Sequence, residues 1–120
     1  MEKQVIETSK KFWEVMENAD EKGMRGIADP RCQFVHIGIT VGLDQEIGFY
    51  TNGNFKPTEV KINSQKATIF DDTAIVLTDC NYTLLIDGEE TTHHFAVTEA
   101  YICRNNEWKL IQFSFTALVY

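Results

Sequence analysis

The chain has 120 residues, of which 43% are apolar and 12% aromatic, enough to build the core of one domain spanning residues 1–120. Eighteen acidic and eleven basic residues give a net charge of −7, and the basic residues form no cluster, which argues against nucleic acid or an anionic membrane as a partner. The N-terminus is charged from its second residue, and no apolar run approaches the roughly 18 residues of a membrane span. We therefore expect a cytoplasmic protein.

The chain begins with two helical patterns. Apolar residues recur at spacings of one, three and four between Val5 and Ala19, with charged residues between them, which predicts an amphipathic helix. Asp20 can then cap a second, shorter helix that extends to Ala28. Proline has no backbone N–H to donate, so Pro30 is predicted to stop this helix.

Short β-rich segments and a third helix follow. Arg31–Ile37 predicts a strand, and the brief Ile39–Val41 between two glycines predicts the second arm of a small hairpin. A third helix is predicted from a cap at Asp44 through Tyr50, with the pair Asn52-Gly53 as its stop.

The second half of the chain predicts one large antiparallel meander. Four long runs rich in aromatic and β-branched residues are separated by short polar turns at positions 71–72, 87–88 and 105–106. The predicted strands are Thr58–Phe70, Thr73–Ile86, Thr91–Arg104 and Trp108–Tyr120.

This order of elements carries a family resemblance. Three features carry it: NAD at the end of the first helix, ADPRCQFVHIG leading into GLDQEIGFY, and Trp108 opening the last strand. In their order and spacing the chain resembles the NTF2-like superfamily over essentially its whole length. The resemblance is strongest to its SnoaL-like, ketosteroid-isomerase-like and DUF4440-type bacterial members. The resemblance implies an α+β cone in which a strongly curved antiparallel sheet of about six strands packs around three N-terminal helices. It further implies a pocket at the open end and a homodimer through the sheet. It implies no single function, because enzymes, transport adaptors and kinase association domains share this frame.

His36 is the candidate catalytic residue. Allowing one inserted residue after Asp29, the resemblance matches His36 to the carboxylate that moves the proton in ketosteroid-isomerase-like members, and an imidazole can act as general acid or base at neutral pH. The alternative is a pocket-lining or core histidine bonded to the backbone. The family's oxyanion-stabilising tyrosine and protonated acid fall on Phe12 and Ala100, which donate no side-chain hydrogen bond, so steroid-type enolisation is not expected.

The pair His93-His94 cannot chelate one ion, because neighbours in a strand point to opposite faces, and we expect no metal and no cofactor. His94 shares its parity with the small and apolar series that continues through Ala96, which we place inside the cone, so His94 is a predicted ligand-binding residue. A bulge before Phe95 would reverse that choice. For Asp79 we favour an outward cross-strand partner over a buried acid.

Further ligand-binding candidates are aromatic. Trp13 and Tyr50 could offer donors from apolar helix faces, although such residues more often belong to a packed core with a polar tip. Tyr82 is expected to line the cone, because it shares its strand face with Val76, Thr78, Cys80 and Leu84. Phe113 and Phe115 lie on the aromatic face of the last strand. The predicted interior offers no Arg or Lys pair, so the expected ligand is a small molecule that is uncharged or weakly polar.

Three functions remain open at this stage. The chain could bind a small molecule in the cone, act as an isomerase, dehydratase or cyclase-type enzyme through His36, or serve as a non-catalytic homodimeric protein-binding or assembly module. The homodimer is expected because the last three strands are apolar on both faces and the helices cover one of them. Gln112, Ser114 and Thr116 would supply hydrogen bonds across the two-fold axis.

Overall fold

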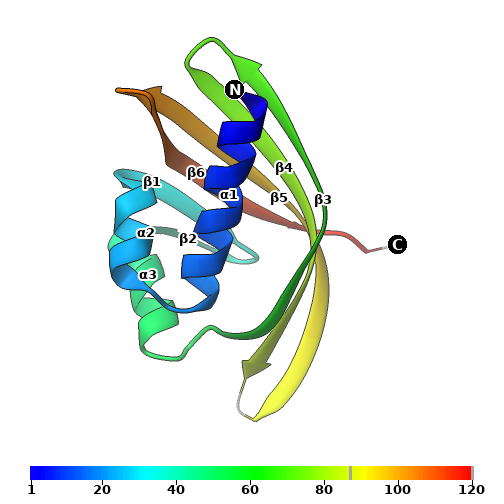
Figure 1. The fold of residues 1–120 in the computed structure, drawn as a ribbon. Helices are drawn as coiled ribbons and strands as arrows, with labels where there is room; N and C mark the ends of the chain where they lie inside the picture. The colour runs from blue at the N-terminus through cyan, green and yellow to red at the C-terminus, as the bar shows by residue number, and fades with distance from the viewer. Residues whose placement is uncertain (87, 120) are drawn as a thin grey trace.

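The computed structural model describes residues 1–86 and 88–119 and confirms an α+β fold (Figure 1). Asp87 of the predicted turn and Tyr120 at the predicted end of the last strand lie outside the described residues. The elements are α1 (Glu2–Glu17), α2 (Glu21–Ile27), β1 (Ala28–His36), β2 (Ile39–Gly42), α3 (Leu43–Thr51), β3 (Lys56–Phe70), β4 (Thr73–Ile86), β5 (Glu89–Arg104) and β6 (Glu107–Ala117).

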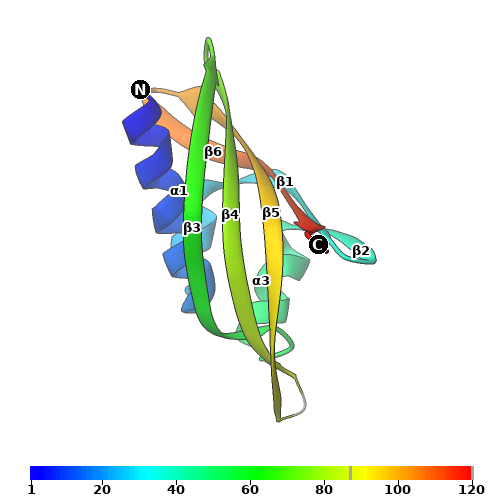
Figure 2. The same ribbon diagram turned by 90° about the vertical axis from the view of Figure 1, so that its right-hand side faces the viewer.

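The strands form one six-stranded sheet in the order β2-β1-β6-β5-β4-β3. The predicted meander from β3 to β6 is antiparallel throughout, and β1 joins it by pairing parallel to β6. The sheet is strongly curved, and the helices lie on its concave side (Figures 1 and 2). None of the helices in the described part of the chain is long and apolar enough to cross a membrane.

Two predicted boundaries near the helices are wrong. The Asp20 carboxylate does cap α2, accepting from the Gly23 N–H at 3.0 Å, but the helix ends at Ile27 and the chain is already extended at Ala28. Pro30 therefore lies inside β1 rather than stopping a helix, consistent with its restriction of the preceding residue to extended conformations. The N-cap of α3 is Gly42 and not Asp44.

Asp44 has another role. Its carboxylate Oδ1 accepts from Arg25 Nη1 at 2.8 Å, so this side chain links α3 to α2 instead of capping its own helix.

The core is an aromatic cluster between α1 and the sheet, with Phe113 at its centre. The Phe113 ring lies 5.4 Å from Phe12, 5.1 Å from Trp13, 5.8 Å from Phe34 and 5.5 Å from Phe115, measured between ring centroids. Phe113 has no exposed surface, so packing among aromatic rings fixes α1 against the sheet at this point.

A β-bulge in β6 changes which residues face the core. Ala100 pairs with Gln112 and Tyr101 with Leu110, so Ile111 is an extra residue in β6. Leu110 and Phe113 are consequently both fully buried. In a strand without a bulge, Leu110 would share a face with Gln112, and the extra residue moves Leu110 to the core side.

Candidate functional site

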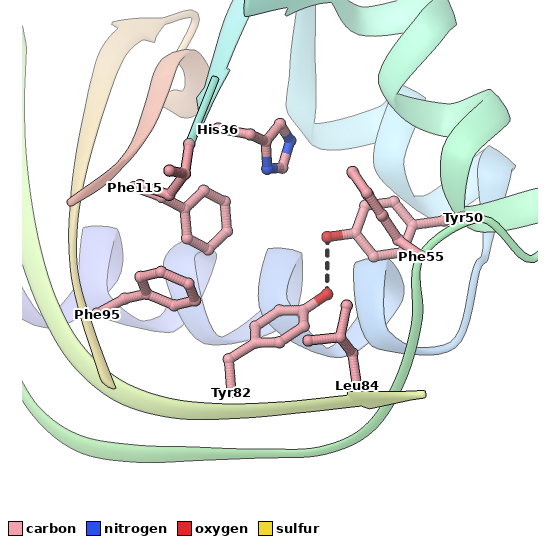
Figure 3. A pocket seen from close by; sticks show the side chains of 8 residues that line it. His36, Tyr50, Phe55, Tyr82, Leu84, Phe95 and Phe115 are labelled. Carbon is pink, nitrogen blue, oxygen red and sulfur yellow. Dashed lines mark hydrogen bonds between the residues drawn. The ribbon is translucent and has the colours of Figure 1, made fainter. Parts of the chain in front are cut away.

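A pocket of about 80 Å³ lies within the open end of the cone (Figure 3). Its walls come from the end of β1, from α3, from the loop before β3, and from β4, β5 and β6. The lining residues are His36, Ile37, Tyr50, Phe55, Tyr82, Leu84, Phe95 and Phe115. The fold therefore brings together the predicted site residues His36, Tyr50, Tyr82 and Phe115.

His36 is held by a buried carboxylate that the sequence reasoning did not single out. Glu46 of α3 has no exposed surface, and its two oxygens lie 2.6 and 2.9 Å from His36 Nε2. Both oxygens engage one ring nitrogen, the arrangement expected when an N–H donates to an ionised carboxylate. In the tautomer that has its proton on Nε2, the other ring nitrogen, Nδ1, carries the lone pair, and Nδ1 lies on the pocket side in Figure 3.

Burial raises the pKa of Glu46, and its hydrogen bond to His36 acts in the opposite direction. A buried carboxylate is stable only when its charge or its lone pairs are matched, and His36 provides that match. Glu46 thus fixes the orientation of the imidazole, while Phe115 stacks on it with centroids 4.9 Å apart and ring planes 20° apart.

Across the pocket from His36, two tyrosine hydroxyls form a pair. Tyr50 and Tyr82 are each 4% exposed, and their hydroxyl oxygens are 2.9 Å apart (Figure 3). Burial raises the pKa of both phenols, so both keep their protons near neutral pH. One hydroxyl donates to the other, which leaves the pair with a hydrogen and lone pairs to offer a ligand.

Trp13 and Phe113, both predicted to bind ligand, lie behind the pocket wall instead. Trp13 is 2% exposed and Phe113 is fully buried, and neither lines the pocket. Their rings lie 6.1 and 5.5 Å from Phe115. They support Phe115, which is the residue that faces the pocket.

The prediction that His94 shares the pocket is wrong. The pairing of β4 with β5 runs without a shift, Asn81 opposite His94 and Cys80 opposite Phe95, so no bulge intervenes and Phe95 is the residue that faces inward. His94 lies on the outer face, where its Nε2 is 2.7 Å from Asp79 Oδ1. Asp79 is on that outer face as predicted.

The parity of β5 was misjudged because its inward series contains an acid. Glu99 is fully buried and accepts four hydrogen bonds, from Ser9 at 2.6 Å, Trp13 at 2.9 Å, Thr78 at 2.5 Å and Tyr101 at 2.6 Å. Burial raises the pKa of Glu99, and these four donors oppose that rise. One signal in the sequence could have indicated this network, namely a serine on the apolar face of the first helix.

The network orients Trp13 and thereby the wall behind the pocket, because the indole N–H donates to Glu99 while the ring packs against Phe115. Gln65 completes the network by donating to the hydroxyls of Ser9 and Thr78 at 2.9 and 3.0 Å. Each of these hydroxyls accepts from Gln65 and donates to Glu99.

Cys80, on the inward face of β4, is not activated as a thiolate. Burial raises the pKa of the Cys80 thiol to about 12, which keeps it protonated and unreactive. Within residues 1–86 and 88–119, no group of three or more His, Cys, Asp or Glu side chains is placed to hold a metal ion.

Solved structures similar to this chain share its fold. An NTF2-like protein from Cytophaga hutchinsonii matches with a TM-score of 0.85 at 20% identity, over 95% of this chain and 95% of that chain. An NTF2-like protein of unknown function in nutrient uptake from Rhodospirillum rubrum matches with a TM-score of 0.87 at 18% identity, over 96% and 98%. The CaMKII hub of S. rosetta matches with a TM-score of 0.82 at 17% identity, over 98% and 96%.

At these identities the structural likeness shows the fold alone. A search of curated proteins gave no match. The sequence profile of the SnoaL-like domain, in contrast, matches residues 5–119. Since this match spans nearly the whole chain, the protein belongs to the SnoaL-like domain family.

Proposed function

We propose that the pocket between His36 and the Tyr50–Tyr82 pair binds a small molecule that is uncharged or weakly polar. The observation that carries this proposal is the composition of the pocket lining. Three polar side chains face apolar walls, and no Arg or Lys is among the described residues that line the pocket. A phosphate or dicarboxylate would find no cationic partner there.

The size of the pocket supports a small ligand. An apolar cavity of about 150 Å³ can hold benzene, so a pocket of about 80 Å³ encloses only a few non-hydrogen atoms. Ile37, which is 65% exposed, forms part of the rim, and a longer ligand would extend past it. The enclosed part would be a group with a hydrogen-bonding oxygen directed at the tyrosines.

The test uses two tryptophan substitutions in one strand. Leu84 of β4 lines the pocket, whereas Leu77 of the same strand is on the outer face and 48% exposed. We expect Leu84→Trp to block the pocket and Leu77→Trp to leave it open. The probes are neutral alcohols, ketones and phenols of roughly four to eight non-hydrogen atoms, together with carboxylates and phosphates of matched size. Binding is detected from changes in the NMR signals of the His36 ring and of the aromatic side chains.

Wild type and Leu77→Trp are expected to bind some of the neutral probes, and Leu84→Trp to bind none. If only the anions bind near His36, or if Leu84→Trp binds the neutral probes as well as Leu77→Trp does, the proposal is wrong.

A second candidate function is acid–base catalysis of the isomerase, dehydratase or cyclase type, and the His36–Glu46 pair favours it. When Nε2 carries the proton and donates to Glu46, Nδ1 is an acceptor on the pocket side, and the two tyrosine hydroxyls lie across the pocket from His36. In such a reaction Nδ1 would take a proton from a carbon next to a carbonyl while a tyrosine hydroxyl donates to the carbonyl oxygen. The imidazolium would return the proton at another position, with no net change in charge.

Deuterium exchange separates catalysis from binding. A ketone that binds in the first experiment is incubated with the protein in D₂O, and the exchange of its α-hydrogens is followed. We expect His36→Gln to abolish the catalysed exchange with little loss of ketone binding. Glu46 positions His36, so Glu46→Gln should slow the exchange and shift the pH profile of the exchange rate. Exchange at the same rate in His36→Gln would rule out this role.

The outer face of the sheet supports a homodimeric module as a further possibility. Leu77 of β4 is 48% exposed on this face, and Ile75 lies on the same face two residues earlier in the strand. We infer that two copies pair through this face, because an apolar sheet face gains stability when a second copy covers it.

A further inference from the structure

A second polar site lies on the sheet, away from the cone pocket, where two arginines meet one buried carboxylate. Asp29 of β1 is 4% exposed. Its Oδ1 accepts from the Arg31 backbone N–H at 2.8 Å and from Arg31 Nε at 3.2 Å, and its Oδ2 accepts from Arg104 Nη1 at 2.8 Å. Two guanidinium groups thus surround one carboxylate, which leaves a local excess of one positive charge.

This excess charge is unusual for the molecule. The chain carries a net charge of −7 and has three arginines, and two of them converge at Asp29. The Arg31 backbone N–H and the two guanidiniums hold the pKa of Asp29 well below its usual range, so the carboxylate stays ionised and keeps both arginines in place.

Asp29 and the two arginines line a depression of about 320 Å³, and the two remaining lining residues are isoleucines. Arg31 comes from β1 and Arg104 from the end of β5, while Ile102 of β5 and Ile111 of β6 form the apolar part. The bulge in β6 makes Ile111 available for this position, since it is the extra residue between Leu110 and Gln112. The volume is within the range of sites for small organic molecules.

Each guanidinium keeps unused donors at this depression. Asp29 engages Nε of Arg31 and Nη1 of Arg104, and no described residue accepts from the other side-chain nitrogens of these two arginines. The planar guanidinium matches the geometry of a carboxylate or phosphate, which accept two parallel hydrogen bonds. The neighbouring isoleucines provide a surface for an apolar group attached to that anion.

We propose that Arg31 and Arg104 form a binding site for an organic oxyanion, a carboxylate or phosphate monoester that carries an apolar body. Asp29 orients the two arginines, the free guanidinium N–H groups bind the anion, and Ile102 and Ile111 contact the apolar body. The site is independent of the cone pocket, from which it differs in both charge and location. The alternative is an ion-pair cluster that only ties β1 to β5 across β6.

The experiment follows the arginine Nε–Hε signals in NMR spectra of the whole protein, in its native oligomeric state. The probes are benzoate, phenyl phosphate, acetate and benzyl alcohol, so that the carboxylate, the phosphate and the apolar body are tested separately. We expect benzoate or phenyl phosphate to shift the signals of Arg31 and Arg104, acetate to bind more weakly, and benzyl alcohol to leave the signals unchanged. The relative strength of the first two probes identifies the preferred anion.

The matched variants are Arg31→Gln, Arg104→Gln and Arg25→Gln. Arg25 is the third arginine, paired with Glu21 and Asp44 in the helical layer, and its substitution changes the net charge equally. At least fivefold weaker binding is expected in the first two variants and unchanged binding in the third. If Arg104→Gln unfolds the protein, Arg31→Gln decides, because the Arg31 side chain is 81% exposed. The proposal is overturned if neither anion shifts the signals, or if all three variants weaken binding alike.

Discussion

Two glycines of α2 allow the packing between α1 and α2 to be measured directly. A Cβ built on Gly23 would lie 2.6 Å from Val15 Cγ1 and 2.7 Å from Asp20 Oδ2, the carboxylate that caps α2. A Cβ on Gly26 would meet nothing within 4 Å. The same substitution in one helix therefore has opposite consequences at the two positions.

Gly26→Ala is expected to raise the free energy of unfolding by about 0.5–1 kcal/mol, because alanine loses less backbone freedom than glycine in a helix. Gly23→Ala gains the same propensity but crowds Val15 and displaces the cap, which costs about 1–3 kcal/mol. The propensity cancels between the two variants, so the difference in stability between them should be about 1–3 kcal/mol in favour of Gly26→Ala.

Urea unfolding of both variants and wild type, monitored by tryptophan fluorescence and circular dichroism, provides the measurement. The midpoint should rise for Gly26→Ala and fall for Gly23→Ala, with similar slopes. If both variants are stabilised equally, the close contact of Gly23 with Val15 does not constrain this corner and the reasoning fails.

Three further outcomes are expected. Phe113→Ala should lower the free energy of unfolding by about 3–5 kcal/mol, because it empties the centre of the aromatic cluster. Phe70 is 58% exposed, so Phe70→Ala should change the free energy of unfolding by less than about 0.5 kcal/mol. Equal losses of stability in urea titrations of the two variants would contradict the packing described. Ser114→Arg should place like charges opposite each other and shift the protein toward monomer; sedimentation showing wild type to be a monomer at about tens of micromolar would refute the dimer. Burial raises the pKa of Glu46 and Glu99 above 4.5, so these two carboxyl groups bind protons more tightly in the folded state than in the unfolded state. The free energy of unfolding should therefore fall as the pH rises from 4.5 through the raised pKa values. Urea titrations across this range should show that slope reduced in Glu99→Gln, and an unchanged slope would show that Glu99 does not contribute to it.

Local patterns in the sequence were enough to determine the elements and part of the pocket. Short polar turns delimit the strands of the meander, and the alternation in β4 correctly placed Tyr82 inside the cone. His36, Tyr50 and Phe115 were also identified as pocket candidates, and all of them line it. These predictions succeeded because helix and strand periodicity depend on residues that are close in the chain.

What the tertiary structure decided depends on residues that are far apart in the chain. An acidic side chain is not expected in a core, so the sequence alone argues against the burial of Glu99. In the fold, Ser9 and Trp13, which are 90 and 86 positions away along the chain, donate hydrogen bonds to Glu99, as does Thr78. This network fixes the inward face of β5, and His94 therefore lies on the outer face. Likewise, Glu46 looks like a surface residue of a short helix until His36 meets it. The burial of a charged group is favourable only when partners from other elements satisfy it, and no local pattern contains those partners.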